Sequence, residues 1–243
     1  MTMDKLKRIL PVLMMALLAS VTLVSCLDSG DDETLDENQK KQWMLQISGN
    51  YSGKMYWYDK FAEKTDKNPD KLDSLETSVK MGIDNKIMLY DFPVKLFFKS
   101  LDLTKNYTAE QLAEKTADEL ALLQRNDQIV EAAENYGNMD LTLNYELFAQ
   151  NNNVLYYYVS PQSVKMSLEY GGKKHDLTVA FILLTSGTYY KNATTLFITE
   201  AAIYDGTDNN GNPALLDGKA FVDNTTSVDN AQDFIFKFVG SSK

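Results

Sequence analysis

The chain has 243 residues, a formal net charge of −10 at pH 7, one cysteine and one histidine. Such an acidic chain repels the phosphates of nucleic acids, so we expect no nucleic-acid partner. The single histidine and single cysteine argue against the usual zinc sites and against Cys/His or Ser/His catalysis, and we expect neither a metal nor another cofactor.

The first 25 residues have the parts of an export signal. Lys5, Lys7 and Arg8 form a positively charged head, and residues 9–23 form an almost continuous apolar run. This run is shorter than the roughly 20 residues that a membrane-spanning helix needs. We therefore expect residues 1–25 to be a signal peptide that is removed.

Cys26 directly follows the apolar run. Together with Leu23, Val24 and Ser25 it resembles the lipobox of bacterial lipoprotein precursors. The alternative is an ordinary secretory signal, which needs a small-x-small cleavage site, and Val21, Leu23 and Val24 fit such a site poorly. The lipobox resemblance implies that Cys26 becomes the mature N-terminus and carries a diacylglyceryl thioether and an amide-linked acyl chain, expected as palmitate. At about 0.8 kcal/mol per buried methylene, several chains would anchor the protein to the bilayer.

Residues 26–33 form an acidic segment with too little apolar surface to fold alone, and we expect a lipidated tether. Its acidic residues also resemble the surface-export signal of Bacteroidetes lipoproteins. The resemblance implies an outer-membrane lipoprotein on the cell surface, and a solvated linker on the periplasmic face is the alternative. Residues 34–243 are expected to form a single globular domain.

The domain is predicted to begin with a short helix and then strands. Thr34 and Glu37 suggest a capping box, and Gly49 ends the helix. Alternating side chains then indicate strands, and Asp84-Asn85 indicates the turn of a hairpin. The three strands predicted in this part cover residues 50–59, 75–81 and 87–90.

A helical section is predicted after these strands. Pro93 suits a helix start and precedes an apolar stripe through Leu101. A second helix is predicted from Thr108, whose capping box Gln111 completes, to residue 123. Residues 129–136 are compatible with either a third helix or a connection.

Strand patterns dominate from residue 139 onward. The best hairpin joins residues 164–170 to residues 177–183, with Gly171-Gly172 in its turn. Further strands are expected at 194–204 and 234–239. The predicted class is α+β, mainly β: an antiparallel β-sandwich or barrel with a two- to three-helix insertion.

The Gly-Asn-Tyr-Ser-Gly-Lys sequence at residues 49–54 adds a further resemblance. With the lipobox and the acidic tether, it is similar to uncharacterised Bacteroidetes outer-membrane lipoproteins, which contain a domain of unknown function. Some of these proteins have calycin-like barrels, which implies a barrel here too. The helical section at 93–125 departs from a simple calycin barrel.

Four tyrosines are the candidate ligand-binding residues: Tyr56 and Tyr58 on one predicted strand, and Tyr156 and Tyr158 on another. If these strands are neighbours, the rings could stack on the faces of a sugar. Packing in the core is the alternative, because aromatic residues are common in strands.

Other candidate sites have weaker signals. We expect His175 to be an ordinary exposed residue of the hairpin. The oxygen-rich loop 205–213 lacks the register of an EF-hand, because Asn210 stands at the glycine position, so we expect a turn rather than a calcium site. Asp73-Ser74-Leu75 resembles the O-glycosylation motif of Bacteroidetes, which implies Ser74 as an acceptor.

The expected function is that of a noncatalytic, extracytoplasmic binding module for a glycan or a peptide. The lipid bilayer is an expected partner through the acylated N-terminus, and an outer-membrane protein is a further candidate partner. A structural or assembly subunit of an outer-membrane complex is the first alternative. A hydrolase that uses acidic residues is the second, although no pair of carboxylates can be selected from the sequence.

Overall fold

The computed structural model describes most of the chain from residue 36 onward. Strands dominate the described part, so the predicted class, α+β and mainly β, is confirmed. The expected signal peptide, the tether and Cys26 lie outside the described residues. The described residues are 36–58, 72–181, 184–198, 201–207, 213–216 and 236–242.

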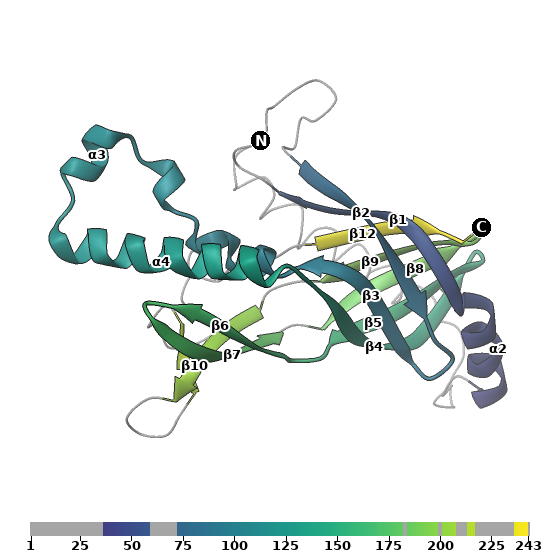
Figure 1. Cartoon of the computed structure of the whole chain (residues 1–243). Coiled ribbons are helices and arrows are strands. Elements are labelled where there is room, and N and C mark those ends of the chain that lie inside the picture. The colour runs from purple at the N-terminus through teal and green to yellow at the C-terminus, as the bar shows by residue number, and fades with distance from the viewer. Residues whose placement is uncertain are drawn as a thin grey trace, which may run out of the picture.

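Eight antiparallel strands form a closed barrel, so the structure selects the barrel rather than the sandwich (Figure 1). Around the barrel the order is β1-β12-β9-β8-β5-β4-β3-β2, and β1 closes it by pairing with both β2 and β12. The strands are β1 (Gly49–Tyr58), β2 (Leu72–Met81), β3 (Lys86–Pro93), β4 (Asn138–Asn151), β5 (Val154–Pro161), β8 (Thr185–Tyr190), β9 (Ala193–Ile198) and β12 (Phe236–Ser241).

Side chains fill the barrel interior. Alternation places Tyr51 and Met55 of β1 inside and leaves Lys54 exposed outside. The buried Tyr157 hydroxyl lies 2.7 Å from the Thr194 hydroxyl and donates to a backbone carbonyl at 3.1 Å. The interior is therefore a packed core with its buried hydroxyls hydrogen-bonded, as small barrels require.

A second antiparallel sheet lies beside the barrel, and we call it the side sheet. Its order is β11-β10-β7-β6. The predicted hairpin is confirmed in β6 and β7, and positive φ angles of 58° and 71° at Gly171 and Gly172 make its two-residue turn. Its strands are β6 (Val164–Tyr170), β7 (Lys173–Phe181), β10 (Ala201–Thr207) and β11 (Pro213–Leu215).

The prediction of one continuous strand over residues 194–204 is wrong. The first part forms β9 in the barrel, and the last part forms β10 in the side sheet. In β10 the consecutive residues Ala201, Ala202 and Ile203 are all buried, so the alternation seen in β9 does not continue there.

Helices cover the barrel and the side sheet. Helix α2 (Glu37–Ile47) buries Trp43 and Ile47 against the barrel. It is capped by Asp36, which accepts from the Asn38 N–H at 3.1 Å, so the predicted N-cap at Thr34 is wrong. None of the described helices is both long enough and apolar enough to cross a membrane.

The insertion after Pro93 begins with the 3-10 helices η1 (Val94–Leu101) and η2 (Thr104–Asn106). The predicted capping box at Thr108 is confirmed, but α3 (Ala109–Ala113) ends after five residues. Thr116 and Glu119 form a second capping box that starts α4 (Ala117–Tyr136). The single predicted helix is therefore two helices, and the ambiguous residues 129–136 form the C-terminal part of α4.

Candidate functional site

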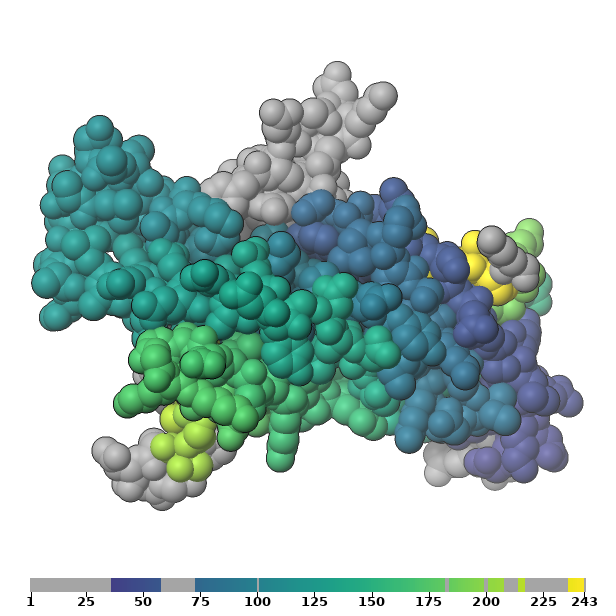
Figure 2. Space-filling view, in the orientation of Figure 1, coloured from purple at the N-terminus to yellow at the C-terminus, as the bar shows by residue number. Residues whose placement is uncertain are grey.

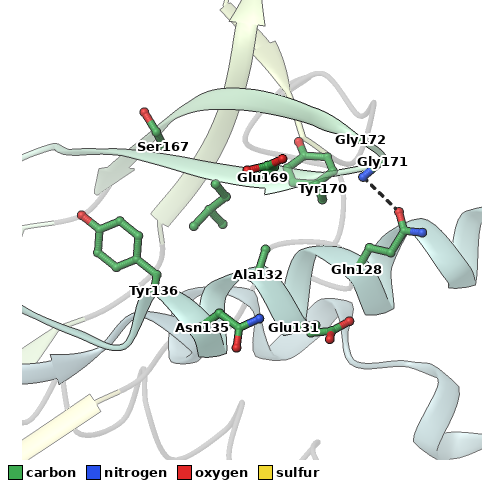
Figure 3. Close-up of a pocket in the computed structure, with 11 residues that line it drawn as sticks. Gln128, Glu131, Ala132, Asn135, Tyr136, Ser167, Glu169, Tyr170, Gly171 and Gly172 are labelled. Carbon is green, nitrogen blue, oxygen red and sulfur yellow. Dashed lines mark hydrogen bonds between the residues drawn. The ribbon is translucent and has the colours of Figure 1, made fainter.

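A groove of about 630 Å³ lies between α4 and the β6–β7 hairpin of the side sheet (Figure 3). The space-filling view shows α4 directly above this hairpin on one face of the molecule (Figure 2). Helix α4 and strand β6 therefore form the two walls of the groove, and none of the described barrel strands lines it. The lining residues are Gln128, Glu131, Ala132, Asn135, Tyr136, Ser167, Leu168, Glu169, Tyr170, Gly171 and Gly172.

Helix periodicity arranges the upper wall. Gln128, Ala132 and Tyr136, each four residues apart, point toward the hairpin, while Glu131 and Asn135 lie on the adjacent stripe at the rim (Figure 3). Both rim residues are exposed. The opposite side of α4 buries Ile129 and Ala133 in the core, which fixes the orientation of the helix.

Strand alternation arranges the lower wall. Leu168 and Tyr170 are buried on the face that packs toward the core, whereas Ser167 and Glu169 are exposed. Four consecutive residues of β6 line the groove, so both faces and the outer edge of this strand contribute to it. The groove therefore presents backbone as well as side chains.

A hydrogen bond fixes the helix to the turn of the hairpin. The Gly171 N–H donates to Gln128 Oε1 at 3.2 Å (Figure 3). This bond joins residues 43 positions apart in the sequence. It connects α4 to the hairpin at one end of the groove (Figure 3).

Tyr170, His175 and Asp205 form a polar cluster behind the groove, which we call the Asp205 cluster. The Tyr170 hydroxyl donates to Asp205 Oδ2 at 2.7 Å, and His175 Nδ1 lies 2.8 Å from the same oxygen. The Tyr170 and His175 rings stack with centroids 3.7 Å apart and planes 9° apart. The cluster links the hairpin to β10.

The electrostatics of the Asp205 cluster favour a neutral tyrosine. Burial raises the pKa of the Tyr170 hydroxyl, and the hydrogen bond to Asp205 and the charge of that carboxylate raise it further. Arg125 opposes this effect, and its Nη2 also donates to the Leu216 carbonyl at 3.0 Å. Tyr170 therefore acts here as a hydrogen-bond donor rather than as an anion.

The expectation that His175 is an ordinary exposed residue is wrong, because its side chain is 23% exposed and bonded to Asp205. The hairpin register contained a signal for this. A two-residue turn pairs Tyr170 with Lys173 and hence Leu168 with His175, which puts the histidine on the buried face. The contact between His175 and Asp205 depends on the pairing of β10 with β7, so the sequence around His175 could not predict it.

The four predicted tyrosines do not form one site. Strand β1 pairs with β2 and β12, whereas β5 pairs with β4 and β8, so the condition that the strands be neighbours fails. Tyr56 lies half-buried on β1, while nothing is described of the Tyr58 side chain.

Tyr156 and Tyr158 instead meet a third ring on the outside of the barrel. Phe148 of β4 stacks on Tyr158 with centroids 4.1 Å apart and an interplanar angle of 18°, and its centroid lies 6.3 Å from that of Tyr156. We call these three residues the outer aromatic patch. Tyr158 is 38% exposed, so the patch reaches solvent.

The remaining predicted sites have different outcomes. Ser74 lies exposed on β2, and its glycosylation stays a prediction. In the loop 205–213, residues 208–212 lie outside the described residues, and the Asp205 carboxylate is bonded to Tyr170 and His175.

The groove contains two carboxylates, Glu131 and Glu169. Sequence reasoning did not select them, because α4 was only partly predicted and its position over β6 was not. In the sequence, Glu131 and Glu169 look like ordinary exposed charged residues, and nothing indicates that they belong to one site. Only the arrangement of the helix against the hairpin places both of them at the same groove, on opposite walls (Figure 3).

Comparisons with known proteins place this architecture in a family. No curated protein and no solved structure matches the chain. A family model described as "Domain of unknown function (DUF4840)" matches residues 46–204. The match includes every residue that lines the groove and ends directly before Asp205. Because the match extends over more than half of the 243 residues, the chain belongs to the DUF4840 family.

Proposed function

We propose that this protein is a lipid-anchored, extracytoplasmic binding module with no catalytic role, and that the groove between α4 and β6 holds its ligand, a peptide or a glycan. The observation that carries the proposal is the groove itself. Its volume of about 630 Å³ falls within the roughly 300–1,000 Å³ typical of ligand sites.

The composition of the groove supports reversible binding. Gln128, Asn135 and Ser167 offer donors and acceptors, while Ala132 and Tyr136 offer apolar contact. This combination of apolar surface and a few polar groups is what recognition of a small ligand or a short chain segment requires.

The exposure of the two groove carboxylates supports a noncatalytic role. A glycoside hydrolase needs one carboxylic acid whose pKa is raised by an apolar environment. Glu131 and Glu169 are both exposed, so water solvates them. We therefore favour binding over hydrolysis.

The location forms part of the proposal and rests on the sequence. Acyl chains on Cys26 would hold the protein on the outer membrane, and the acidic residues after it favour the cell surface. Mass spectrometry of the mature N-terminus should find an acylated Cys26. Protease added to intact cells should degrade the protein if it is on the surface, and an unmodified thiol would overturn the lipid anchor.

The binding proposal is tested by screening the full chain, purified in detergent, on a glycan array and on a peptide array. We expect retention that falls at least tenfold in the double variant Glu131→Lys/Glu169→Lys. The matched control is Glu37→Lys/Glu114→Lys, which changes the net charge equally at two exposed positions outside both proposed sites. Equal retention by both double variants would overturn the groove as the site.

The outer aromatic patch supports a second candidate site for a glycan. Tyr158 is exposed and stacked on Phe148, so the patch presents aromatic surface to solvent on the outside of the barrel. Planar rings of this kind stack on sugar faces. Loss of glycan retention in Tyr156→Ala/Tyr158→Ala, but not in the groove variant, would select the patch.

A further inference from the structure

Strand β6 is the last strand of the side sheet, so one of its edges has no neighbouring strand in the described part of the chain. An unpaired edge presents a row of backbone N–H and C=O groups that another strand can bind. In this protein that edge lies at the groove, because Ser167 to Tyr170 line it without interruption.

The hairpin register identifies the outward backbone groups. Tyr170 and Lys173 flank the two-residue turn and therefore exchange hydrogen bonds with each other. Alternation then directs the N–H and C=O of Glu169, Ser167 and Lys165 away from β7. Gly171 continues this series, and its N–H does point outward, since it donates to Gln128.

The lining of the groove sets the length of strand that could pair there. Four consecutive residues of β6, Ser167 to Tyr170, line it. At about 3.3 Å per residue, they offer about 13 Å of strand edge.

The charges of the groove indicate the chemistry of the occupant. Glu131 on the rim of α4 and Glu169 on β6 are the charged residues among its described lining, and both are exposed. These carboxylates would attract lysine or arginine side chains of a bound segment, although the exposed Lys174, which pairs with Glu169 across the hairpin, and Lys165 on the same face of β6 offset part of this attraction. Asn135, one helical turn from Glu131, adds a polar group along the same rim.

We propose that the groove binds an extended cationic peptide as an additional strand on the outer edge of β6, with Glu131 and Glu169 contacting its basic side chains. This inference rests on the proposed function and names its ligand class. Main-chain hydrogen bonds to Ser167 and Glu169 supply affinity, and the two carboxylates supply selectivity. Gln128 ends the added strand, because it occupies the Gly171 N–H.

The test uses the full chain in detergent and a labelled eight-residue peptide in which lysine and valine alternate. We expect saturable binding, at least tenfold weaker binding of the peptide with glutamate in place of lysine, and at least tenfold weakening by Glu131→Lys/Glu169→Lys. The control Glu37→Lys/Glu114→Lys should retain most of the affinity. Thermal unfolding of both double variants checks that they fold.

Two further probes separate strand addition from simple charge attraction. Both probes are versions of the lysine–valine peptide with methyl groups on backbone nitrogens, on the lysines in one and on the valines in the other. Because alternate N–H groups point to opposite edges of an extended peptide, each version blocks a different edge of the peptide. We expect only one of them to bind, because a strand pairs with β6 through a single edge. Amide hydrogen exchange should slow at Ser167 and Glu169, whereas the Leu168 amide, already directed toward β7, should change little.

The outcomes distinguish this inference from the proposed function. Equal binding of the two methylated peptides would overturn strand addition and leave the groove as a binding site. Failure of the lysine peptide, together with groove-dependent retention of a glycan, would also overturn only the inference. If no retained ligand is affected by the groove variant, both proposals fail.

Discussion

The barrel and the side sheet use their polar groups differently. Inside the barrel, Tyr51 donates to the Ile47 carbonyl at 2.5 Å and Tyr145 donates to the Gly82 carbonyl at 2.7 Å. These hydroxyls are therefore already hydrogen-bonded within the fold. In the side sheet, Ser167, Glu169 and an outward strand edge lie at the groove. The barrel thus uses these hydroxyls to hold its core, whereas the side sheet leaves polar groups exposed at the groove, where we propose that a ligand binds.

Glycines make the dense barrel interior possible. A Cβ at Gly187 would lie 2.2 Å from atoms of the Tyr157 ring, and a Cβ at Gly240 would lie 2.4 Å from Phe238. Large aromatic residues thus fill the space that glycine leaves. In the side sheet, a Cβ at Gly172 meets nothing within 4 Å. The same residue type is a packing requirement in one region and a turn residue in the other.

The largest expected effect comes from Gly53→Ala in the barrel. The added Cβ would lie 2.0 Å from the Val239 carbonyl oxygen and 2.5 Å from the Gly240 Cα, so the backbone of β12 must move. We expect a loss of about 3 kcal/mol in the free energy of unfolding, measured in urea. Gly172→Asn in the side sheet is the matched control, because asparagine tolerates positive φ, and it should cost well under about 1 kcal/mol. Similar losses in both variants would contradict the comparison.

The buried tyrosines predict a loss of barrel stability at high pH. Burial raises the pKa of Tyr145 from the ordinary 10.0 to about 12, and burial also raises the pKa of Tyr51 and Tyr157. The folded state therefore holds these protons more tightly than the unfolded chain. The stabilisation is complete below the unfolded pKa and is lost as pH rises through the folded pKa.

The unfolding temperature should thus fall between about pH 10 and about pH 12 for this reason. Tyr145→Phe removes one of the titrating groups, so the pH dependence of its unfolding temperature should be shallower than that of the unmodified chain. Identical slopes for the two proteins would show that Tyr145 ionises as easily in the fold as outside it.

A smaller and local effect is expected from Asp205→Asn. The substitution keeps the shape of the side chain but removes the charge that accepts from Tyr170 and pairs with His175. We expect a loss of about 1 kcal/mol, because charge-assisted hydrogen bonds are strong but this cluster is partly exposed. Amide exchange should become faster in β6, β7 and β10 and remain unchanged in β1 and β12. Faster exchange throughout the barrel would mean that the two regions unfold as one.

Local patterns predicted much of the fold. Alternation identified β6 and β7, and the Gly171-Gly172 pair specified their turn. The Thr108 capping box was also correct, because it depends on two residues close in sequence. The closure of the barrel was not predictable in this way. It pairs β1 with β12, and side-chain periodicity within a strand carries no information about so distant a partner.

The candidate site was harder to predict for the same reason. The groove needs α4 over β6, and the Asp205 cluster needs β10 beside β7, so both arise from contacts between distant segments. One site formed by all four tyrosines required β1 and β5 to be neighbours, and the pairing of the strands does not meet this condition. What the sequence did indicate correctly was that Tyr156 and Tyr158 share one face, because they are two residues apart on a strand.

The smallest expected change in stability comes from Tyr156→Ala/Tyr158→Ala on the outside of the barrel. Both rings contact Phe148 rather than the interior, so their removal leaves the core intact. We expect a loss of about 0.5 kcal/mol or less in the free energy of unfolding, as for other substitutions at the surface. Retention on a glycan array is measured in parallel, and Tyr157→Ala, which empties a core position, serves as the contrasting variant with a loss of about 3 kcal/mol or more. If the surface pair proved as damaging as the core residue, the outer face would belong to the scaffold and could not be a separate place for recognition.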